Sequence, residues 1–217
     1  KLFKGIIFDG SEASDYQIDM KAKATDDGES LIVETKISSV NEQGKLVFHY
    51  GAELILARQR IASPEVRLAI PTRAENAQAL YSNGTLFHGP SLQGINEVLE
   101  CNEQGLLLRC QVPSVANDKQ GDFPLSNSGE QSNIFANDLA YQGMLVWAKK
   151  ELGLGSLPSS TQSWTVYREV TLDECFYLKL TVVKSSGKGK QRGALTADIQ
   201  LISENNQVLS EIKAAKV

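Results

Sequence analysis

Apolar and polar residues alternate along much of the chain, and a period of two is typical of β-strands. Within the first sixty residues, this alternation predicts strands at 16–22, 31–37 and 46–56. In the last of these, Leu46, Phe48 and Tyr50 begin an apolar face, and His49 falls on the opposite face. We therefore expect His49 to be exposed to solvent.

The pattern changes after residue 60. Pro64 and Pro71 interrupt any strand ladder, and a short helix is predicted at 75–81, closed by a turn at Gly84. We interpret 61–84 as a linker between two halves of the chain.

The second half combines one helix with a series of strands. The strands are predicted at 92–99, 106–112, 162–170, 175–184, 194–203 and 207–216. The helix, 139–152, is apolar on nearly all sides and is therefore expected to be buried. Asp138, with the preceding asparagine, provides an N-cap, and Gly153 ends the helix. Residues 113–136, rich in Ser, Asn, Gly and Pro, are expected to form a long loop.

A sheet that buries a single helix has to curve around it, which indicates a hotdog fold of the α+β class. We assign 85–217 to one such unit and interpret 1–60, three strands without a helix, as the C-terminal part of another. The expected architecture is a double hotdog whose first unit is incomplete at its N-terminus. Because Lys1 and Val217 lie close to predicted strands, we expect the chain to be a piece of a longer polypeptide.

The composition excludes several classes of protein. Of the 217 residues, 41% are hydrophobic and 22% are charged, as in chains that bury a core. A net charge of −4 argues against a broad nucleic-acid-binding surface. No apolar run reaches the roughly 18 residues that a membrane span needs. Three cysteines without metal-type spacing indicate a reducing compartment, so a cytoplasmic location is expected.

Two polar side chains of the predicted helix are candidates for chemistry. Asp138 and Gln142 are four residues apart and therefore share one helix face. A carboxyl group near the helix N-terminus, oriented by an amide, is able to hold or deliver a proton at a substrate oxygen. The plainer interpretation is a capping aspartate with an amide nearby.

The two histidines, His49 and His88, add few alternatives. His88 lies in a Gly-Pro turn, where it either hydrogen-bonds locally or lines a ligand tunnel. No partnered serine or cysteine indicates a triad and no cysteine pair indicates a zinc site, so we expect no metal. A basic hairpin tip is either simply solvated or docks an acidic carrier protein. The tip comprises Lys184, Lys188, Lys190 and Arg192.

Three short segments follow one another in the second half. They are 86–95 (Leu-Phe-His-Gly-Pro-Ser-Leu-Gln-Gly-Ile), 138–142 (Asp-Leu-Ala-Tyr-Gln) and 157–159 (Leu-Pro-Ser). In order and spacing they resemble the His-Gly-Pro, Asp-x-x-x-Gln and Leu-Pro motifs of polyketide-synthase dehydratase domains. The residues between Tyr141 and Leu157 are most similar to dehydratase-like domains of bacterial polyunsaturated-fatty-acid synthases.

This resemblance implies a double hotdog that removes water from 3-hydroxyacyl thioesters and yields trans-2-enoyl thioesters without a cofactor. The substrate would be carried on the phosphopantetheine of an acyl carrier protein. Asp138 is implied to be the general acid and Gln142 its orienting partner, while His88, Gly89 and Pro90 are implied to bind substrate. The implied partners are acyl carrier protein domains, other domains of the same synthase and a second copy in a homodimer.

The sequence departs from the family at the expected base. In the family, this base is a histidine in a His-x-x-x-Gly-x-x-x-x-Pro motif of the first hotdog, and the present sequence contains no such motif. We expect the base to precede Lys1 and the chain to be inactive by itself. The alternative is a dehydratase-like domain that binds acyl chains or neighbouring domains without turnover. A thioesterase shares the fold, but the Gly-Pro segment disfavours it.

Overall fold

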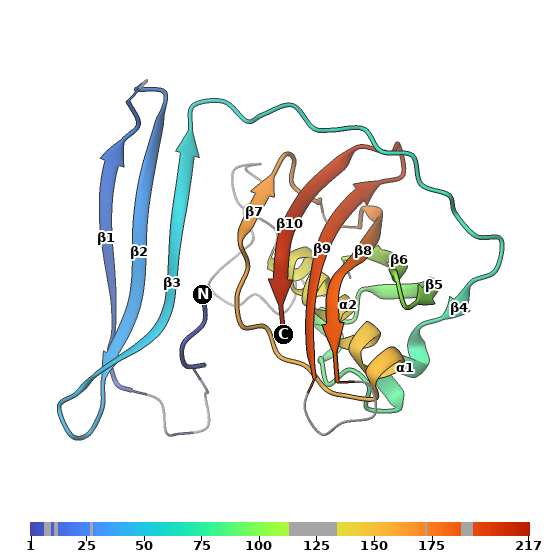
Figure 1. The fold of residues 1–217 in the computed structure, drawn as a ribbon, viewed down its shortest axis with the longest axis horizontal. Coiled ribbons are helices and arrows are strands. Elements are labelled where there is room, and N and C mark those ends of the chain that lie inside the picture. Colours follow the sequence, from blue (N-terminus) through green and yellow to red (C-terminus); the bar gives the residue numbers. More distant parts are fainter. Residues whose placement is uncertain (7–9, 11–12, 27, 113–133, 172, 188–192) are drawn as a thin grey trace. The chain divides into compact units, whose positions relative to one another are not determined.

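The computed structural model describes residues 1–6, 10, 13–26, 28–112, 134–171, 173–187 and 193–217. Two compact units, Lys1–Arg60 and Ile61–Val217, each contain an antiparallel sheet (Figure 1). Of the predicted loop 113–136, residues 113–133 lie outside the described part, and 134–136 are helical. No helix in the described part of the chain is long and apolar enough to span a membrane.

The first unit is a three-stranded sheet with the strand order β1-β2-β3. Its strands are β1 (Tyr16–Ala24), β2 (Ser30–Val40) and β3 (Leu46–Ala57), as the alternation predicts. Many large apolar side chains of this sheet are exposed. They include Ile18, Met20, Leu31, Leu54, Ile55 and Leu56. The first unit therefore presents substantial apolar surface, as expected of strands without a covering helix.

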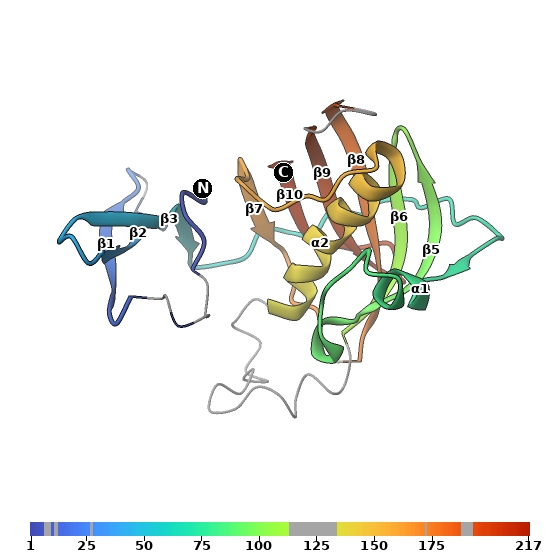
Figure 2. The same ribbon diagram turned by 90° about the horizontal axis from the view of Figure 1, so that it is seen from below.

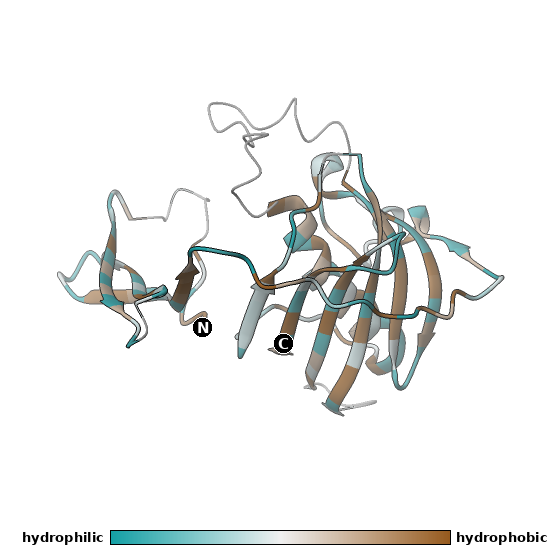
Figure 3. Cartoon of the chain, turned by 90° about the horizontal axis from the view of Figure 1, so that it is seen from above, coloured by the Kyte–Doolittle hydropathy of each residue, from teal (hydrophilic) through white to brown (hydrophobic). Residues whose placement is uncertain are grey.

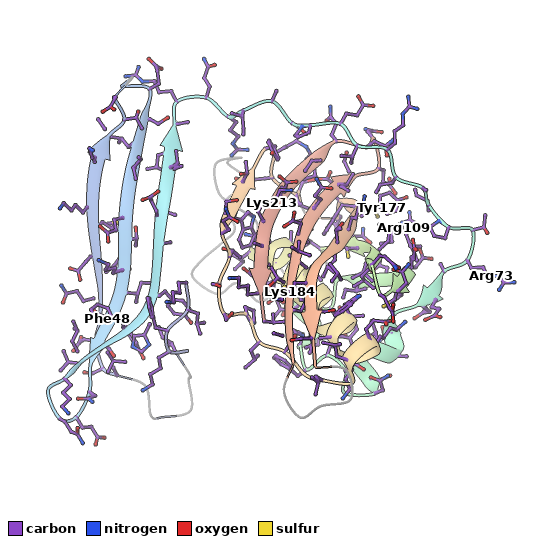
Figure 4. All side chains as sticks on the ribbon, in the orientation of Figure 1. Phe48, Arg73, Arg109, Tyr177, Lys184 and Lys213 are labelled. Atoms are coloured by element: carbon purple, nitrogen blue, oxygen red, sulfur yellow. The ribbon has the colours of Figure 1, made fainter. Side chains whose placement is uncertain are left out.

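The prediction that His49 is exposed is wrong. His49 is only 4% exposed, and its Nε2 lies 2.8 Å from the Oγ of Ser39. Its Nδ1 lies 3.1 Å from the carbonyl oxygen of Lys4, and the ring of Tyr16 contacts it edge-on. Phe48, labelled in Figure 4, is 46% exposed. Lys4 and Tyr16 thus contact His49 on the face that alternation within β3 assigns to solvent, so the period of two alone misassigns this residue.

The second unit is a seven-stranded sheet with the order β4-β5-β6-β8-β9-β10-β7. The strands are β4 (Glu75–Asn76), β5 (Ile95–Asn102), β6 (Gly105–Gln111), β7 (Ser163–Val166), β8 (Cys175–Ser186), β9 (Ala194–Ser203) and β10 (Val208–Lys216). Helix α2 (Ile134–Trp147) lies across one face of this sheet (Figure 2). This is the hotdog-like α+β arrangement that the pattern of strands and one apolar helix predicts.

Alternate residues of the central strands point to opposite faces of the sheet. Leu108 pairs with Leu178 in the ladder, and both are fully buried beneath α2. The next pair, Arg109 and Tyr177, lies on the outer face, where Figure 4 shows their side chains. The alternation is visible as hydrophobic and hydrophilic bands along the strands in Figure 3.

Helix α2 is buried along most of its length, as its apolar sequence predicts. Gly143 permits close packing on β8, because a Cβ at this position would lie 3.0 Å from Cδ2 of Leu178. The helix continues as a π-helical turn, Ala148–Leu152, and ends at Gly153 with a left-handed backbone, φ 73°. The predicted C-terminus of the helix is therefore confirmed.

Part of the segment interpreted as a linker, 61–84, is packed into the second unit. Strand β4 pairs with β5, and helix α1 (Gln78–Ser82) follows it. Ala77 is fully buried and Leu80 is 7% exposed, and both belong to the core of the second unit. These contacts fix α1 against the sheet and so position its side chains near α2.

Candidate active site

Three elements of the second unit bring polar side chains together. Helix α2 contributes Asp138 and Gln142, and α1 contributes Tyr81. His88 comes from the segment between α1 and the 3₁₀ turn Pro90–Leu92. Segments that are far apart in sequence thus converge on one face of α2.

The helix begins earlier than the sequence predicts, and this changes the role of Asp138. Helix α2 starts at Ile134, so Asp138 is its fifth residue and lies within the helix. The interpretation of Asp138 as an N-cap is therefore wrong. The sequence pattern misses the first turn because Phe135 and Ala136 follow a polar stretch, although both side chains are buried in the core.

The amide of Gln142 is held at both ends. Its Nε2 donates to Oδ2 of Asp138 at 2.8 Å and to the carbonyl oxygen of Leu92 at 2.7 Å. Its Oε1 accepts a hydrogen bond from the hydroxyl of Tyr81 at 3.0 Å. Since Gln142 is also only 1% exposed, its side chain has a single orientation with all its polar atoms used.

His88 lies beside the Asp138 carboxyl group, near the same oxygen that Gln142 bonds. Its Nε2 is 3.6 Å from Oδ2 of Asp138, and its side chain is only 11% exposed. The ring of Phe87 stacks on the imidazole with 4.4 Å between centroids. Burial lowers the pKa of His88, while the negative charge of Asp138 acts in the opposite direction. The imidazole is therefore neutral at pH 7.

One nitrogen of His88 is unused. Among the described residues, no hydrogen-bond partner lies within reach of its buried Nδ1. The main chain of His88 is fixed instead, because its carbonyl oxygen accepts from Nε2 of Gln93 at 2.9 Å. His88 thus presents an imidazole edge to Asp138 on a backbone that is anchored locally.

The Gly-Pro segment forms a tight turn against α2. Gly89 has an extended backbone, and its carbonyl oxygen accepts from the N–H of Leu92 at 2.9 Å, closing the turn that starts at Pro90. Gly94, two residues after the turn ends at Leu92, is closely packed. A Cβ there would lie 2.6 Å from the carbonyl oxygen of Gln111 and 2.8 Å from Cδ1 of Leu139. Glycine at this position lets the turn approach the helix.

The carboxyl group of Asp138 is accessible as well as anchored. Its side chain is 34% exposed, whereas Gln142 behind it is buried. Hydrogen bonding on one oxygen and exposure of the side chain leave the group able to meet a ligand from outside the helix. Such an arrangement suits a proton donor to a bound oxygen atom.

Metal ligands and the basic hairpin tip are the other features considered in the sequence. Among the residues that the structure describes, no group of three or more His, Cys, Asp or Glu side chains is arranged to hold a metal ion. Of the basic hairpin tip, Lys184 lies near the end of β8 (Figure 4), and Lys188, Lys190 and Arg192 lie outside the described residues.

A comparison with known protein families identifies the family of this chain. Residues 59–217 match the family described as "Polyketide synthase dehydratase N-terminal domain". The chain belongs to the polyketide synthase dehydratase family. The resemblance to polyketide-synthase dehydratase domains is therefore confirmed.

One relative is a polyunsaturated fatty acid synthase subunit. A polyunsaturated fatty acid synthase polypeptide from Thraustochytrium sp. is 29% identical over 221 residues, and the match includes the whole of this chain. The chain spans only 8% of that relative's length.

Solved dehydratase structures share the fold. A trans-AT PKS dehydratase domain from Brevibacillus brevis is 19% identical, with a TM-score of 0.65, over 93% of this chain and 68% of that one. The dehydratase domain of RzxB from Pseudomonas fluorescens is 11% identical, with a TM-score of 0.69, over 99% of this chain and 72% of that one. At these identities the likeness concerns the fold.

The sequence does not indicate every residue of this cluster of side chains. Tyr81 and the main-chain carbonyl of Leu92 both bond Gln142. Tyr81 lies outside the three recognised segments, and Leu92 lies within 86–95 but acts through its main chain, which its residue type does not reveal. The hydroxyl of Tyr81 is separated from Gln142 by 61 positions in the chain. The predicted short helix at 75–81 places Tyr81 on an element, but no periodic pattern relates it to α2.

Proposed function

We propose that this chain is part of a multidomain synthase and serves to dehydrate 3-hydroxyacyl thioesters carried on an acyl carrier protein. The products would be trans-2-enoyl thioesters. The observation that carries the proposal is the 2.8 Å hydrogen bond by which Gln142 orients the accessible carboxyl group of Asp138, beside the ring of His88.

The reaction requires an acid and a base at neighbouring carbon atoms. A base removes the proton from the α carbon, and the electrons of that C–H bond form the new double bond to the β carbon. The β C–O bond breaks, and the departing hydroxyl group takes a proton and leaves as water. Hydroxide is a poor leaving group, so a positioned proton donor lowers this barrier.

Asp138 is the proton donor in this scheme. Gln142 fixes the rotamer of the carboxyl group, so that one oxygen is held and the other is free to approach the β-hydroxyl group. His88, Gly89 and Pro90 form part of the substrate wall, where the neutral imidazole of His88 is able to exchange hydrogen bonds with an acyl thioester. Holding the hydroxyl group and the donor together supplies much of the catalytic effect.

The base is proposed to come from outside this chain. The sequence has two histidines, and the buried ring of His49 is already bonded through both nitrogens to Ser39 and Lys4. We propose that the remainder of a double hotdog provides the base, with 85–217 as its second hotdog and 1–60 as part of its first. The matched family description refers to an N-terminal domain, and the assignment of each unit to a hotdog stays a prediction.

A second function is favoured by one observation. The sequence lacks the His-x-x-x-Gly-x-x-x-x-Pro motif, so the domain is also a candidate for a dehydratase-like scaffold that binds acyl chains or neighbouring domains without turnover. The two functions predict different chemistry from the same substrate, and they are separable by one assay.

The experiment supplies the synthase polypeptide containing this chain with 3-hydroxyacyl groups attached to its acyl carrier protein. Mass spectrometry of the carrier-bound acyl group then measures the loss of one water. Dehydration is expected to convert the 3-hydroxyacyl group into the trans-2-enoyl group. If the carrier-bound substrate binds but never loses water, the proposed dehydratase function is contradicted and the scaffold function is supported.

A further inference from the structure

Tyr81 joins the site through its hydroxyl group rather than through its ring. The oxygen accepts a hydrogen bond from the main-chain N–H of Ile95 at 3.1 Å. The same hydroxyl group donates to Oε1 of Gln142 at 3.0 Å, and Gln142 donates in turn to Asp138. A continuous series of hydrogen bonds therefore runs from the first residue of β5 to the carboxyl group on α2.

We propose that Tyr81 is a positioning residue, whose hydroxyl group sets the orientation of the Gln142 amide and, through it, that of the Asp138 carboxyl group. The kinetic consequences of this proposal rest on the dehydratase function proposed above. Its structural part concerns only the amide and is testable without catalysis.

The orientation of an amide is decided by its neighbours, because its two ends have similar shapes and opposite hydrogen-bonding character. If the Gln142 amide were reversed, its oxygen would face the carboxyl group of Asp138 and the carbonyl oxygen of Leu92. Both are acceptors. Its NH₂ group would then face Tyr81, so the reversed amide is disfavoured wherever Tyr81 acts as a donor.

The N–H of Ile95 occupies one acceptor position of the Tyr81 hydroxyl group. A tyrosine hydroxyl is able to donate one hydrogen bond and to accept others. The N–H of Ile95 can only donate, so it takes an acceptor position on the oxygen and leaves the hydroxyl hydrogen for Gln142. Because Asp138 and the carbonyl oxygen of Leu92 accept from the NH₂ group of Gln142, its oxygen faces Tyr81 and accepts the hydroxyl hydrogen.

Burial keeps the hydroxyl group protonated. The ring of Tyr81 is half-buried and packs against the core of the second unit. Burial raises the pKa of Tyr81, with a smaller contribution of the same sign from Asp138. Tyr81 therefore remains a donor throughout the pH range of an enzyme assay.

The first test measures the Gln142 amide directly. In the ¹⁵N-labelled chain, the side-chain NH₂ resonances of Gln142 are assigned by their loss in Gln142→Leu. In the unaltered chain, the two amide hydrogens of Gln142 are expected to exchange slowly with solvent, because both are hydrogen-bonded to protein groups, Asp138 and Leu92. Tyr81→Phe keeps the ring but removes the hydroxyl group, and exchange is expected to accelerate. Unchanged exchange and chemical shift would overturn the proposal, whatever the synthase catalyses.

The second test is kinetic and uses the whole synthase. Tyr81→Phe is expected to lower kcat about tenfold, the effect of one neutral hydrogen bond, with KM nearly unchanged. In a Gln142→Leu background, the same change is expected to have no further effect on kcat, because its target is absent. A general structural role would instead multiply the two losses, and that result would overturn the proposal.

Tyr141→Phe provides the matched control. Tyr141 precedes Gln142 on α2, is also half-buried and contacts Trp164 edge-on at 6.0 Å between ring centroids. Its replacement is expected to leave kcat and the Gln142 resonances as they are. A synthase that releases no enoyl product in any form would contradict the proposed dehydration, while accelerated amide exchange in Tyr81→Phe would still support the positioning role.

Discussion

The Nε2 of Gln142 donates a hydrogen bond to Oδ2 of Asp138, one helical turn earlier on α2. The amide is buried and the carboxyl group is partly exposed, so the pair holds a reactive group at the surface of the core without burying it. This geometry needs the 3₁₀ turn as well, because the carbonyl oxygen of Leu92 accepts the other amide hydrogen. The site therefore depends on the residues that keep the turn, the helix and the histidine in place.

Gly94→Ala is expected to destabilise the second unit. Its Cβ would meet the main-chain oxygen of Gln111 at 2.6 Å, and main-chain atoms do not move aside cheaply. We expect a loss of about 1–3 kcal/mol in the free energy of unfolding, typical of overpacking. Urea unfolding followed by tryptophan fluorescence measures it, because Trp147 and Trp164 are the two tryptophans and both lie in this unit.

Gly89→Ala is the control for that experiment. Gly89 has φ −70° and ψ 170°, an ordinary extended backbone, and apart from its chain neighbours no described residue comes within 4 Å of an added Cβ. Its free energy of unfolding is expected to change by no more than about 0.5 kcal/mol. Equal stability of the two variants would show that the turn does not pack on α2 as described.

His88 is expected to make stability depend on pH. Burial lowers its pKa below the ordinary histidine value of about 6.5, so the unfolded chain binds more protons between the two values. The free energy of unfolding should therefore fall as the pH drops from 6.5 toward the folded-state pKa, and this contribution is lost below it. Above pH 6.5 the contribution is fully present.

Urea unfolding of the unaltered chain and of His88→Gln, at about pH 7.5 and about pH 5.5, measures this effect on both sides of the ordinary pKa. The unaltered chain is expected to lose more stability on acidification than the variant does. Asp138, which faces His88, is present in both proteins. An equal or smaller loss in the unaltered chain would contradict the assigned direction.

Trp147 is expected to anchor the end of α2 to the hairpin between β5 and β6. Its Nε1 donates to the carbonyl oxygen of Asn102 at 2.8 Å, and the residue is only 1% exposed. Trp147→Phe removes this bond and part of the packed volume, so thermal unfolding followed by circular dichroism should show a loss of about 1–3 kcal/mol.

Trp164→Phe gives the comparison. Its buried Nε1 has no hydrogen-bond partner within the described residues, so phenylalanine removes no bond there and relieves an unsatisfied donor. We expect a clearly smaller loss than for Trp147→Phe. A larger loss at Trp164 would mean that the hydrogen bond of Trp147 contributes little to stability.

The fold follows from the sequence where one element explains its own pattern. The alternation in β8 and β9 is set by one buried face, and the near-continuous apolar run of α2 by burial on several sides. Gly153 marks the helix end because a left-handed residue is needed there. Such local signals are sufficient for a hotdog-like arrangement.

Contacts between distant segments account for what the sequence does not reveal. His49 is buried because residues near Lys4 cover it, and nothing within β3 encodes that contact. Helix α2 starts at Ile134 because its first turn packs into the core, although the sequence just before it has the composition of a loop. Within the site, Asp138 and Gln142 are predictable from their spacing, whereas Tyr81 is brought to Gln142 only by tertiary structure.

The most direct measurement is the rate at which the synthase containing this chain dehydrates its carrier-bound 3-hydroxyacyl substrate, with and without Asp138→Asn. Asparagine keeps the shape of the side chain but has no acidic proton. A fall in kcat of at least about 100-fold is expected, with unchanged thermal unfolding and with the exposed Glu100→Gln as an inert control. Turnover by Asp138→Asn at the rate of the unaltered synthase would contradict the assignment of Asp138 as the proton donor.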